Sequence, residues 1–423
     1  VAMKAEKVMG LIGFILVLIL GNVLLKTDML YFRLLMGVGF GYTLSRAYTG
    51  FAGSVYRAYR TGSTKLMRAM NAMFFVTSLV VAAILFRSDP TSYKLWINPI
   101  NMGLIMGAFL FGFGMCIAMC CATGVLTTLA SSFTRALVVI VFFGLGVLLG
   151  FPIQNSMGWV KNSWITSPTG AMSGGGVFLP DLFKWDGLNG YLGAVLLIGL
   201  FSSIVIFISY QYEKKRKLSN TYIGNPMEME QENRKKFDAA SFKLFNAETY
   251  EHIFVKPWTL IEGAIILTIL FTILFSVTKA GWGASTPHGI FMGKLLMLFG
   301  VSPETLANFT KMPATAYSTP FFQNEGLVQN FGIVVGTILY LMTAGKFVKS
   351  FKSGLRIPVR EALFYGFGGI TMGLGTRLAN GCNVGALYSP IAELSLSGWI
   401  FLVFMVLGAI VSEKMFFKFP SSK

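Results

Sequence analysis

Charged side chains are scarce in this sequence of 423 residues. Asp, Glu, Lys and Arg make up 13% of it, whereas about 25% is usual in soluble domains. Hydrophobic residues make up 54%, and the mean hydropathy is +0.65. The shortage of charge excludes an ordinary soluble domain and indicates a chain built to face lipid.

Histidine and cysteine are also few, with two histidines and four cysteines. The cysteine spacing matches neither a secreted disulfide framework nor paired zinc ligands. The sequence lacks the phosphate-binding motif G-x-x-x-x-G-K-[ST] and any hydrolase-like set of Ser, His and acidic residues. We therefore expect no metal site, no cofactor and no enzymatic activity, and an ATP-driven pump is disfavoured.

Acidic residues number 18 against 35 basic ones, which gives a net charge of +17. The basic residues lie between apolar stretches and not on one face of a soluble helix. Retention of Lys and Arg in cytoplasmic loops explains this pattern better than nucleic-acid binding does. The expected partner is a lipid bilayer, and no nucleic acid is expected.

Long apolar runs are abundant, and several reach the roughly 20 residues that a helix needs to cross a bilayer. The first follows Lys4 and Lys7, but it is too long for a signal-peptide core and lacks a cleavage site, so it predicts a retained helix, with a signal anchor as the alternative. The sequence thus predicts an all-α polytopic membrane protein. Spanning helices are expected at 8–25, 29–50, 64–86, 101–120, 135–152, 190–212, 257–278, 329–348, 359–380 and 397–416.

A polar stretch at 213–256 divides the chain into an N-terminal membrane half, 1–212, and a C-terminal membrane half, 257–423. It contains both basic and acidic clusters and is expected to be a cytoplasmic linker. A plain connector is the simpler interpretation, and an amphipathic or partner-binding segment is the alternative.

Loop charge predicts the orientation of the helices. The loops at 57–68 and 346–360 are rich in Lys and Arg, so we expect them in the cytoplasm. The longer loops at 153–189 and 279–328 are sparse in both residues and belong outside. Both chain termini are then cytoplasmic.

An internal repeat appears when the segment around Cys121 is laid without gaps on the segment around Cys382. Packed membrane helices are rich in small residues, but a shared C-x-x-G ending favours duplication. Repeat 1 covers about 29–152, and repeat 2 lies in the C-terminal half. The identical pairs are Gly107/Gly368, Gly112/Gly373, Gly114/Gly375, Ala118/Ala379, Cys121/Cys382, Gly124/Gly385 and Leu126/Leu387.

The expected orientation makes the two repeats inverted, because the helix entering Cys121 runs inward and the helix entering Cys382 runs outward. Inverted repeats are typical of secondary transporters, which bind their substrates near the membrane midplane. The stretches 122–134 and 383–395 follow the C-x-x-G cysteines and are too short or broken to span. We expect two short half-helices that dip into the bilayer there.

Cys121 and Cys382 are the first candidates for a substrate pathway. A thiol is a weak donor on a polarizable sulfur, which suits a soft sulfur ligand better than a strongly hydrated oxyanion. Burial as small hydrophobic residues is the alternative, and repetition at equivalent positions weighs against it. Cys116 and Cys120 lie nearby in the sequence. One of them is expected to face the same cavity while the other packs.

Arg377 lies in an otherwise apolar helix, where a charge is costly and indicates a pathway or a buried partner. An anion is its natural ligand. The alternative is that it pairs with Glu361, Glu393 or free backbone carbonyls near a helix end.

The remaining candidates flank the C-x-x-G motifs. Asn380 and Asn383 could donate hydrogen bonds to an oxyanion, or they could cap the backbone. Gly124 and Gly385 end the two motifs and shape the predicted pathway.

The string GGITMGLGTRLANGCNVGALYSPIAELSLSGWIF, at 368–401, resembles the signature of the YeeE/YedE family of bacterial membrane proteins, which includes thiosulfate transporters and a selenium-metabolism branch. GAFLFGFGMCIAMCCATG, at 107–124, resembles the family's other repeat, and 37–62 resembles a third segment. That third segment often contains a cysteine where Gly50 or a neighbour stands here. Met119 and Cys120 also replace two residues that are usually small.

The resemblance implies an inverted helical duplication with an hourglass profile in a bacterial inner membrane. It further implies that thiosulfate passes between cysteines that hydrogen-bond its sulfur, a role that falls on Cys121 and Cys382. A selenium compound is an alternative substrate. An alternative function of a different class is that of a sulfurtransferase subunit, which hands sulfur to a cytosolic carrier of the TusA type. That function requires a thiolate reachable from the cytoplasm.

Overall fold

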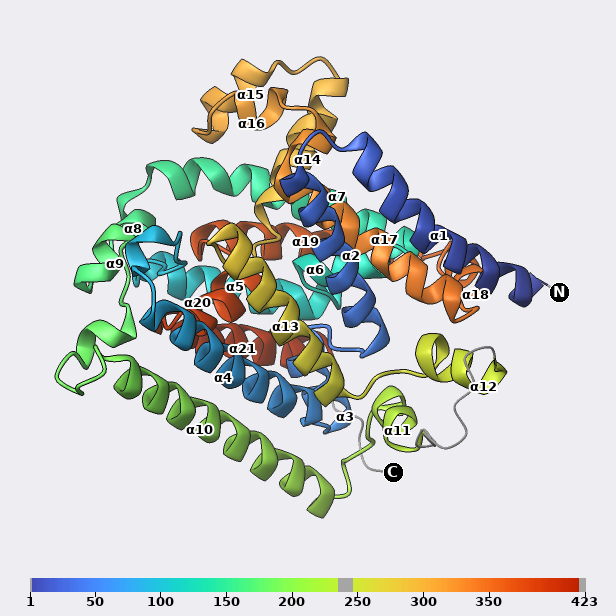
Figure 1. Ribbon diagram of the computed structural model, residues 1–423, viewed down its shortest axis with the longest axis horizontal. Coiled ribbons are helices and arrows are strands. Elements are labelled where there is room, and N and C mark those ends of the chain that lie inside the picture. The colour runs from blue at the N-terminus through green and yellow to red at the C-terminus, as the bar shows by residue number, and fades with distance from the viewer. Residues whose placement is uncertain (1, 235–245, 418–423) are drawn as a thin grey trace.

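The computed structural model describes residues 2–234 and 246–417 as a bundle of helices (Figure 1). The extended pairings in these ranges are two isolated β-bridges, Lys94 with Ala280 and Phe178 with Ser395. The predicted all-α fold class is confirmed. The long helices are α1 (Ala2–Leu24), α2 (Asp28–Arg46), α4 (Lys65–Phe86), α5 (Met102–Ala118), α7 (Phe133–Ser156), α10 (Tyr191–Leu218), α13 (Leu260–Thr278), α14 (Thr286–Leu298), α17 (Glu325–Thr343), α19 (Val359–Leu378) and α21 (Leu396–Phe416).

Short helical segments connect the long helices and form the ends of the bundle. The α-helical ones are α3 (Gly53–Thr61), α6 (Ala122–Thr128), α8 (Gly158–Lys161), α9 (Pro168–Met172), α11 (Pro226–Glu232), α12 (Ala247–Tyr250), α15 (Pro303–Thr310), α16 (Thr315–Ser318), α18 (Phe347–Ser353) and α20 (Ser389–Ala392). The tighter or wider turns are η1 (Pro90–Ser92), η2 (Leu179–Leu182), η4 (Glu251–Val255), η5 (Phe321–Gln323) and η6 (Asn383–Tyr388).

Eight helical segments of the described chain are long and apolar enough to cross a membrane, namely α1, α4, α5 continued through α6, α7, α10, α13, α17 and α21. The prediction of a multi-pass membrane protein is therefore confirmed. Helices also occupy the remaining predicted spans, where α2 and α19 are 19 and 20 residues long. Both contain arginine, which lowers their hydropathy.

The stretch 279–328, expected to be a loop, contains a further helix that packs into the bundle. The face of α14 that includes His288, Gly289 and Gly293 is buried. Gly289 lies against Val147 and Phe151 of α7. Its polar and proline-rich surroundings concealed this helix in the sequence, because burial of one face by α7 compensates for a short apolar run.

Glycines bring α5 and α19 together as antiparallel neighbours. Gly107 lies against the backbone of Gly375, and Gly114 lies against the backbone of Gly368. A Cβ atom at any of these four glycines would come within 2.5 to 2.8 Å of a backbone atom of the other helix. Since backbone atoms cannot yield as side chains can, close helix contact requires glycine here.

Glycines also bring α5 and α19 into close contact with their outer neighbours, α21 and α7. Gly112 of α5 lies against the carbonyl of Met405 in α21, and Gly373 of α19 lies against the carbonyl of Phe143 in α7. The contact of α5 with α21 is thus matched by the contact of α19 with α7. Each pair joins a helix that enters a C-x-x-G motif to the long helix that follows the other motif.

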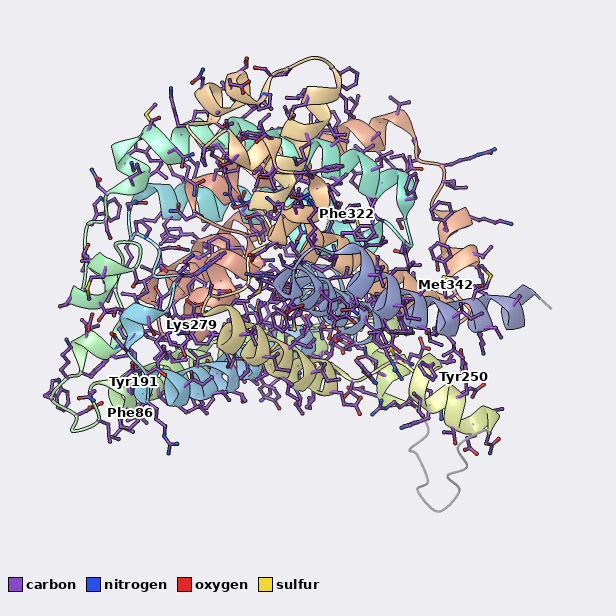
Figure 2. All side chains as sticks on the ribbon, turned by 45° about the horizontal axis from the view of Figure 1, so that its top comes forward. Phe86, Tyr191, Tyr250, Lys279, Phe322 and Met342 are labelled. Atoms are coloured by element: carbon purple, nitrogen blue, oxygen red, sulfur yellow. The ribbon has the colours of Figure 1, made fainter. Side chains whose placement is uncertain are left out.

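Two ends of the bundle can be distinguished. Phe86, at the end of α4, and Tyr191, at the start of α10, lie together with their ring centroids 5.9 Å apart. Figure 2 shows them at one end, and Tyr250 and Met342 at the opposite end. The loops with the clustered basic residues lie at the second end, since α4 begins and α17 ends there.

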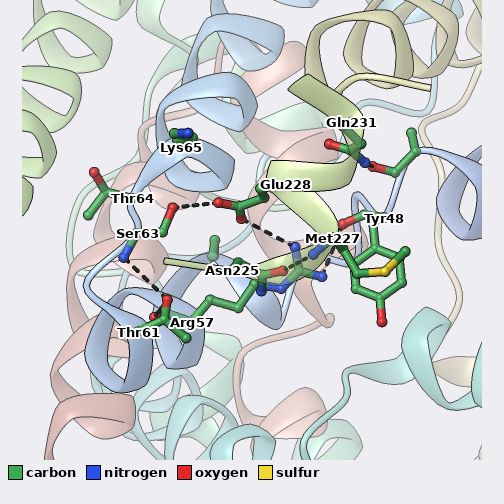
Figure 3. Close-up of polar contacts among 12 residues, drawn as sticks. Tyr48, Arg57, Thr61, Ser63, Thr64, Lys65, Asn225, Met227, Glu228 and Gln231 are labelled. Atoms are coloured by element: carbon green, nitrogen blue, oxygen red, sulfur yellow. Dashed lines mark hydrogen bonds and ion pairs between the residues drawn. The ribbon is translucent and has the colours of Figure 1, made fainter. Parts of the chain in front are cut away.

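Described parts of the 213–256 stretch pack against the membrane helices (Figure 3). On α11, Glu228 and Gln231 are each 2% exposed. Gln231 Nε2 donates to the carbonyl of Ala47 over 2.8 Å, and Glu228 accepts from Ser63 Oγ and pairs with Arg57 at 3.7 Å. This part does more than connect two halves, and positions 235–245 of the predicted linker lie outside the described residues.

Candidate functional site

A cavity of about 490 Å³, here called the inner cavity, opens at the end of the bundle that carries the basic loops. Its walls come from the ends of α2 and α17, from α3 and α6, and from the start of α7. Cys120, Cys121 and Gly124 line it. The predicted first C-x-x-G motif is therefore reached by a cavity.

The chain turns sharply before each motif cysteine. Met119 and Asn380 have φ values of 56° and 59°, in the left-handed region that side chains other than glycine rarely adopt. Met119 is the C-cap of α5 and Asn380 follows the C-cap of α19, each two positions before its cysteine, and a short helix begins after each turn. Matching backbone strain at matching positions holds the two cysteines in place.

The two cysteines cap these short helices. Cys121 is the N-cap of α6, and its Sγ accepts from the amide of Gly124 over 3.4 Å. Cys382 is the N-cap of η6 with nearly the same backbone angles, φ −103° and ψ −167° against −109° and −174°. Both side chains are 1% exposed. The two thiols lie close enough for a charge on one to affect the other.

The neighbouring cysteines differ in position. Cys120 lines the inner cavity, as Cys121 does. Cys116 is fully buried beside α21, close enough to Glu413 for an electrostatic interaction. The carbonyl oxygen of Cys116 lies 3.4 Å from the Arg60 guanidinium. Cys120 is thus the member of this pair on the cavity wall, and Cys116 is the member that packs between helices.

Basic side chains predominate over acidic ones around the inner cavity. Arg57, Arg135 and Lys346 line it together with one acid, Glu230. Within residues 2–234 and 246–417, neither Arg135 nor Lys346 forms an ion pair. Excess positive charge in a cleft attracts anions.

A second cavity of about 420 Å³, the outer cavity, lies at the other end of α4. Tyr93, Lys94 and Trp96 line it, together with Gly174. The ring of Trp96 lies against Gly385 of the second motif, where a Cβ atom would come within 2.3 Å of the ring. Because Gly385 has no side chain, the ring of Trp96 fits between the outer cavity and η6.

Arg377 has no carboxylate partner among the described residues. Its side chain donates to Ser285 Oγ at 2.5 Å, Thr286 Oγ1 at 3.0 Å and Gln154 Oε1 at 3.3 Å. The residue is 3% exposed and within electrostatic range of Cys382. The alternative of an ion pair with Glu361 or Glu393 is therefore wrong, and a buried cation remains free to attract an anion.

The two asparagines occupy separate environments. Asn380 Oδ1 accepts from Gln154 Nε2 over 2.6 Å, so it extends the polar group around Arg377. Asn383 is fully buried, with its Nδ2 3.1 Å from the sulfur of Met115. Asn383 thus lies in the contact between η6 and α5.

Two residues near the motifs were not singled out from the sequence. His288 Nε2 lies 3.0 Å from the carbonyl of Ala122, the residue after Cys121. Trp96 lies between the outer cavity and Gly385. A histidine in an expected loop and an isolated tryptophan carry no motif signal. In the described ranges, no three His, Cys, Asp or Glu side chains gather closely enough to hold a metal ion.

The helices and cavities define a multi-pass helical membrane protein with small-residue packing around two buried thiols. The chain belongs to the sulphur-transport family, whose profile matches residues 46–411. The expected YeeE/YedE resemblance is confirmed by this match and by named relatives.

The relatives include a probable transporter and two thiosulfate transporters. The probable transporter YedE of Escherichia coli K12 is 30% identical over 155 residues, and the match covers 37% of this chain and 37% of that protein. The thiosulfate transporter TsuA of Spirochaeta thermophila is 25% identical over 90% of this chain and 97% of its own length. TsuA of Escherichia coli K12 is 21% identical over 94% of this chain and 97% of its own length.

Proposed function

We propose that this protein transports thiosulfate or a related small sulfur anion across the bacterial inner membrane. The observation that carries the proposal is the pair of thiols, Cys121 and Cys382, at matching helix caps. Cys121 lines the inner cavity, and the motif of Cys382 touches the ring of Trp96, which lines the outer cavity. Family membership and two thiosulfate transporters that match nearly the whole chain support the same substrate class. In this proposal the protein acts as a transporter and catalyses no reaction.

The thiols provide selectivity for sulfur. Thiosulfate carries a terminal sulfur that is larger, softer and less hydrated than an oxyanion oxygen, and S–H groups can donate weak hydrogen bonds to it. Cys121 and Cys382 bind this sulfur in turn. Arg377 and the basic side chains of the inner cavity attract the negative charge.

The two C-x-x-G segments form an inverted repeat around this pathway. The antiparallel packing of α5 on α19 supports this proposal, as do the matched contacts with α21 and α7. The short segments α6 and η6–α20 act as half-helices, and the left-handed turns before them let each helix dip toward the other. Cytoplasmic termini and a cytoplasmic inner cavity complete the proposed orientation.

Two alternatives keep the same site. A selenium anion would bind the thiols by similar chemistry. A TusA-type carrier in the cytoplasm could dock at the inner cavity and receive sulfur at Cys120 or Cys121, both of which line it. Stimulation of uptake by purified carrier would favour this second role.

Uptake by purified protein in lipid vesicles tests the proposal. Vesicles containing the protein should accumulate or exchange radiolabelled thiosulfate faster than protein-free vesicles, and excess unlabelled thiosulfate should compete better than sulfate. Equal competition by sulfate would contradict sulfur selectivity. Absence of any thiosulfate flux, in protein shown to be folded, would overturn the proposed substrate.

A further inference from the structure

A buried carboxyl group lies between the outer cavity and the second C-x-x-G motif. Glu393 ends α20, is fully buried and accepts a hydrogen bond at Oε2 from the backbone amide of Trp96. Its other oxygen, Oε1, has no hydrogen-bond partner among the described residues. A buried carboxylate with one donor is poorly solvated, whereas a protonated carboxyl supplies its own O–H.

Oε1 lies in tight surroundings and receives no hydrogen bond from the described residues. Oε1 lies against Gly281, where a Cβ atom would come within 2.0 Å of it. Ser389 is adjacent, but its hydroxyl donates to the carbonyl of Trp282 over 2.8 Å and accepts from the Trp282 amide over 2.9 Å. This hydroxyl is therefore already committed to the backbone.

No basic side chain neutralises this carboxyl within the described ranges. Lys94 and Lys279, on the two segments that pack against it, are exposed at the outer end. Asp181 pairs with Lys184, and the Tyr388 hydroxyl bonds Thr77 over 3.0 Å.

The other helices in contact with α20 present no charge to it either. Within α4 and α21 the charged side chains lie at the opposite ends, and Arg87, which follows α4 at the outer end, is exposed. Glu413 of α21 is also fully buried but pairs with Arg60 at 2.9 Å. Cys382 begins the η6 turn that leads into α20. Glu393 thus differs from Glu413. No basic side chain of the described ranges pairs with Glu393, so a proton is the cation that can neutralise it.

We propose that Glu393 is a proton-binding site that couples proton entry from the outer cavity to uptake of the anion, a step that rests on the proposed transport function. A dianion that enters a cell with a negative interior moves against the membrane potential, and each co-transported proton cancels one of its two charges and so lowers the electrical work of uptake. One proton from outside adds to the Glu393 carboxylate, and the same proton leaves to the cytoplasm after the anion. No other bond forms or breaks.

Trp96 links protonation to the pathway. Its amide holds Glu393, and its ring occupies the space that Gly385 leaves open. Loss of the proton creates a buried charge that requires water or further donors, and movement of Trp96, which lines the outer cavity and holds Glu393, would admit them. Movement of Trp96 uncovers Gly385, which belongs to the same C-x-x-G motif as Cys382. Loss of the proton and passage of the anion therefore both require the same segment to move.

Purified protein in vesicles, with a medium more acidic than the lumen, tests the coupling. We expect the unmodified protein to concentrate radiolabelled thiosulfate in response to the acid pulse. Glu393→Gln should lose acid-driven accumulation but still exchange labelled for unlabelled thiosulfate at equal pH, and Glu393→Asp should regain part of the drive. The matched control is Glu361→Gln, on the exposed start of α19, which should behave as the unmodified protein.

Proton movement in the unmodified protein is a second readout, which remains informative if Glu393→Gln misfolds. A pH-sensitive dye in the lumen should report acidification when thiosulfate is added outside. Absence of acidification during thiosulfate flux would overturn the proton site, as would full acid drive in Glu393→Gln. Absence of thiosulfate exchange in the unmodified protein would instead overturn the proposed substrate, so the two failures are distinguishable.

Discussion

At the scale of single residues, Arg377 is a buried guanidinium among hydroxyl and amide groups. Because Ser285, Thr286 and Gln154 leave its positive charge uncompensated, a dianion near Cys382 gains attraction from it. We expect Arg377→Gln to weaken apparent substrate affinity by about 1 to 3 kcal/mol, with partial rescue by Arg377→Lys. The measurement is the substrate concentration for half-maximal uptake.

The control for this substitution is Arg87→Gln, at the exposed outer end of α4, which should leave uptake unchanged. If Arg377→Gln transports as the unmodified protein does at equal protein levels, the charge is structural and the anion binds elsewhere.

The sequence singled out the motif residues of the candidate site but not the residues around them. The repeated C-x-x-G segments identified Cys121 and Cys382, because equivalent positions in a repeat show a pattern that burial alone does not produce. His288 and Trp96 were missed, since each contacts a motif through tertiary packing across more than a hundred residues of sequence. The hydrogen-bond partners of Arg377 were also missed, for the same reason.

At the scale of elements, α11 is held to the membrane helices by a buried ion pair and two hydrogen bonds (Figure 3). Glu228→Ala should leave Arg57 without its carboxylate and release α11, at a cost of about 3 kcal/mol. Hydrogen exchange at the α11 amides should become faster.

The matched control is Glu232→Ala, which removes an exposed pair with Lys65, since Glu232 is 56% exposed. That change should cost about 0 to 1 kcal/mol. Equal exchange rates in both variants would contradict a role for the buried pair in holding α11.

Long helices were predictable because each needs an apolar run of nearly constant length. The predicted spans at 29–50 and 359–380 coincide with α2 and α19 despite their arginines. The helix α14 was not predicted, because its stability depends on burial against α7. The packing of α11 was not predicted either, because a polar sequence does not reveal which of its acids finds a buried arginine.

At the scale of the whole molecule, the proposed orientation has a direct test. All four native cysteines are buried, so an introduced surface cysteine reports its own side of the membrane. Lys215→Cys, at the exposed end of α10, should resist an impermeant thiol reagent added to intact cells and react after the cells are opened. Trp185→Cys, at a residue 82% exposed in the opposite loop, should react in intact cells. Labelling of Lys215→Cys from outside would contradict the proposed cytoplasmic placement of the inner cavity and the termini.

The central claim is that the two motif thiols form a sulfur-selective pathway, and uptake of radiolabelled thiosulfate by vesicles with equal amounts of each purified variant tests it most directly. Cys121→Ser and Cys382→Ser should each reduce flux by about two- to tenfold, because a harder, more hydrated oxygen replaces the sulfur. Cys116→Ser, whose side chain is buried away from the inner cavity, should reduce it less. The double variant Cys121→Ala, Cys382→Ala should lose selective uptake while remaining folded, and full activity in that variant would contradict the account.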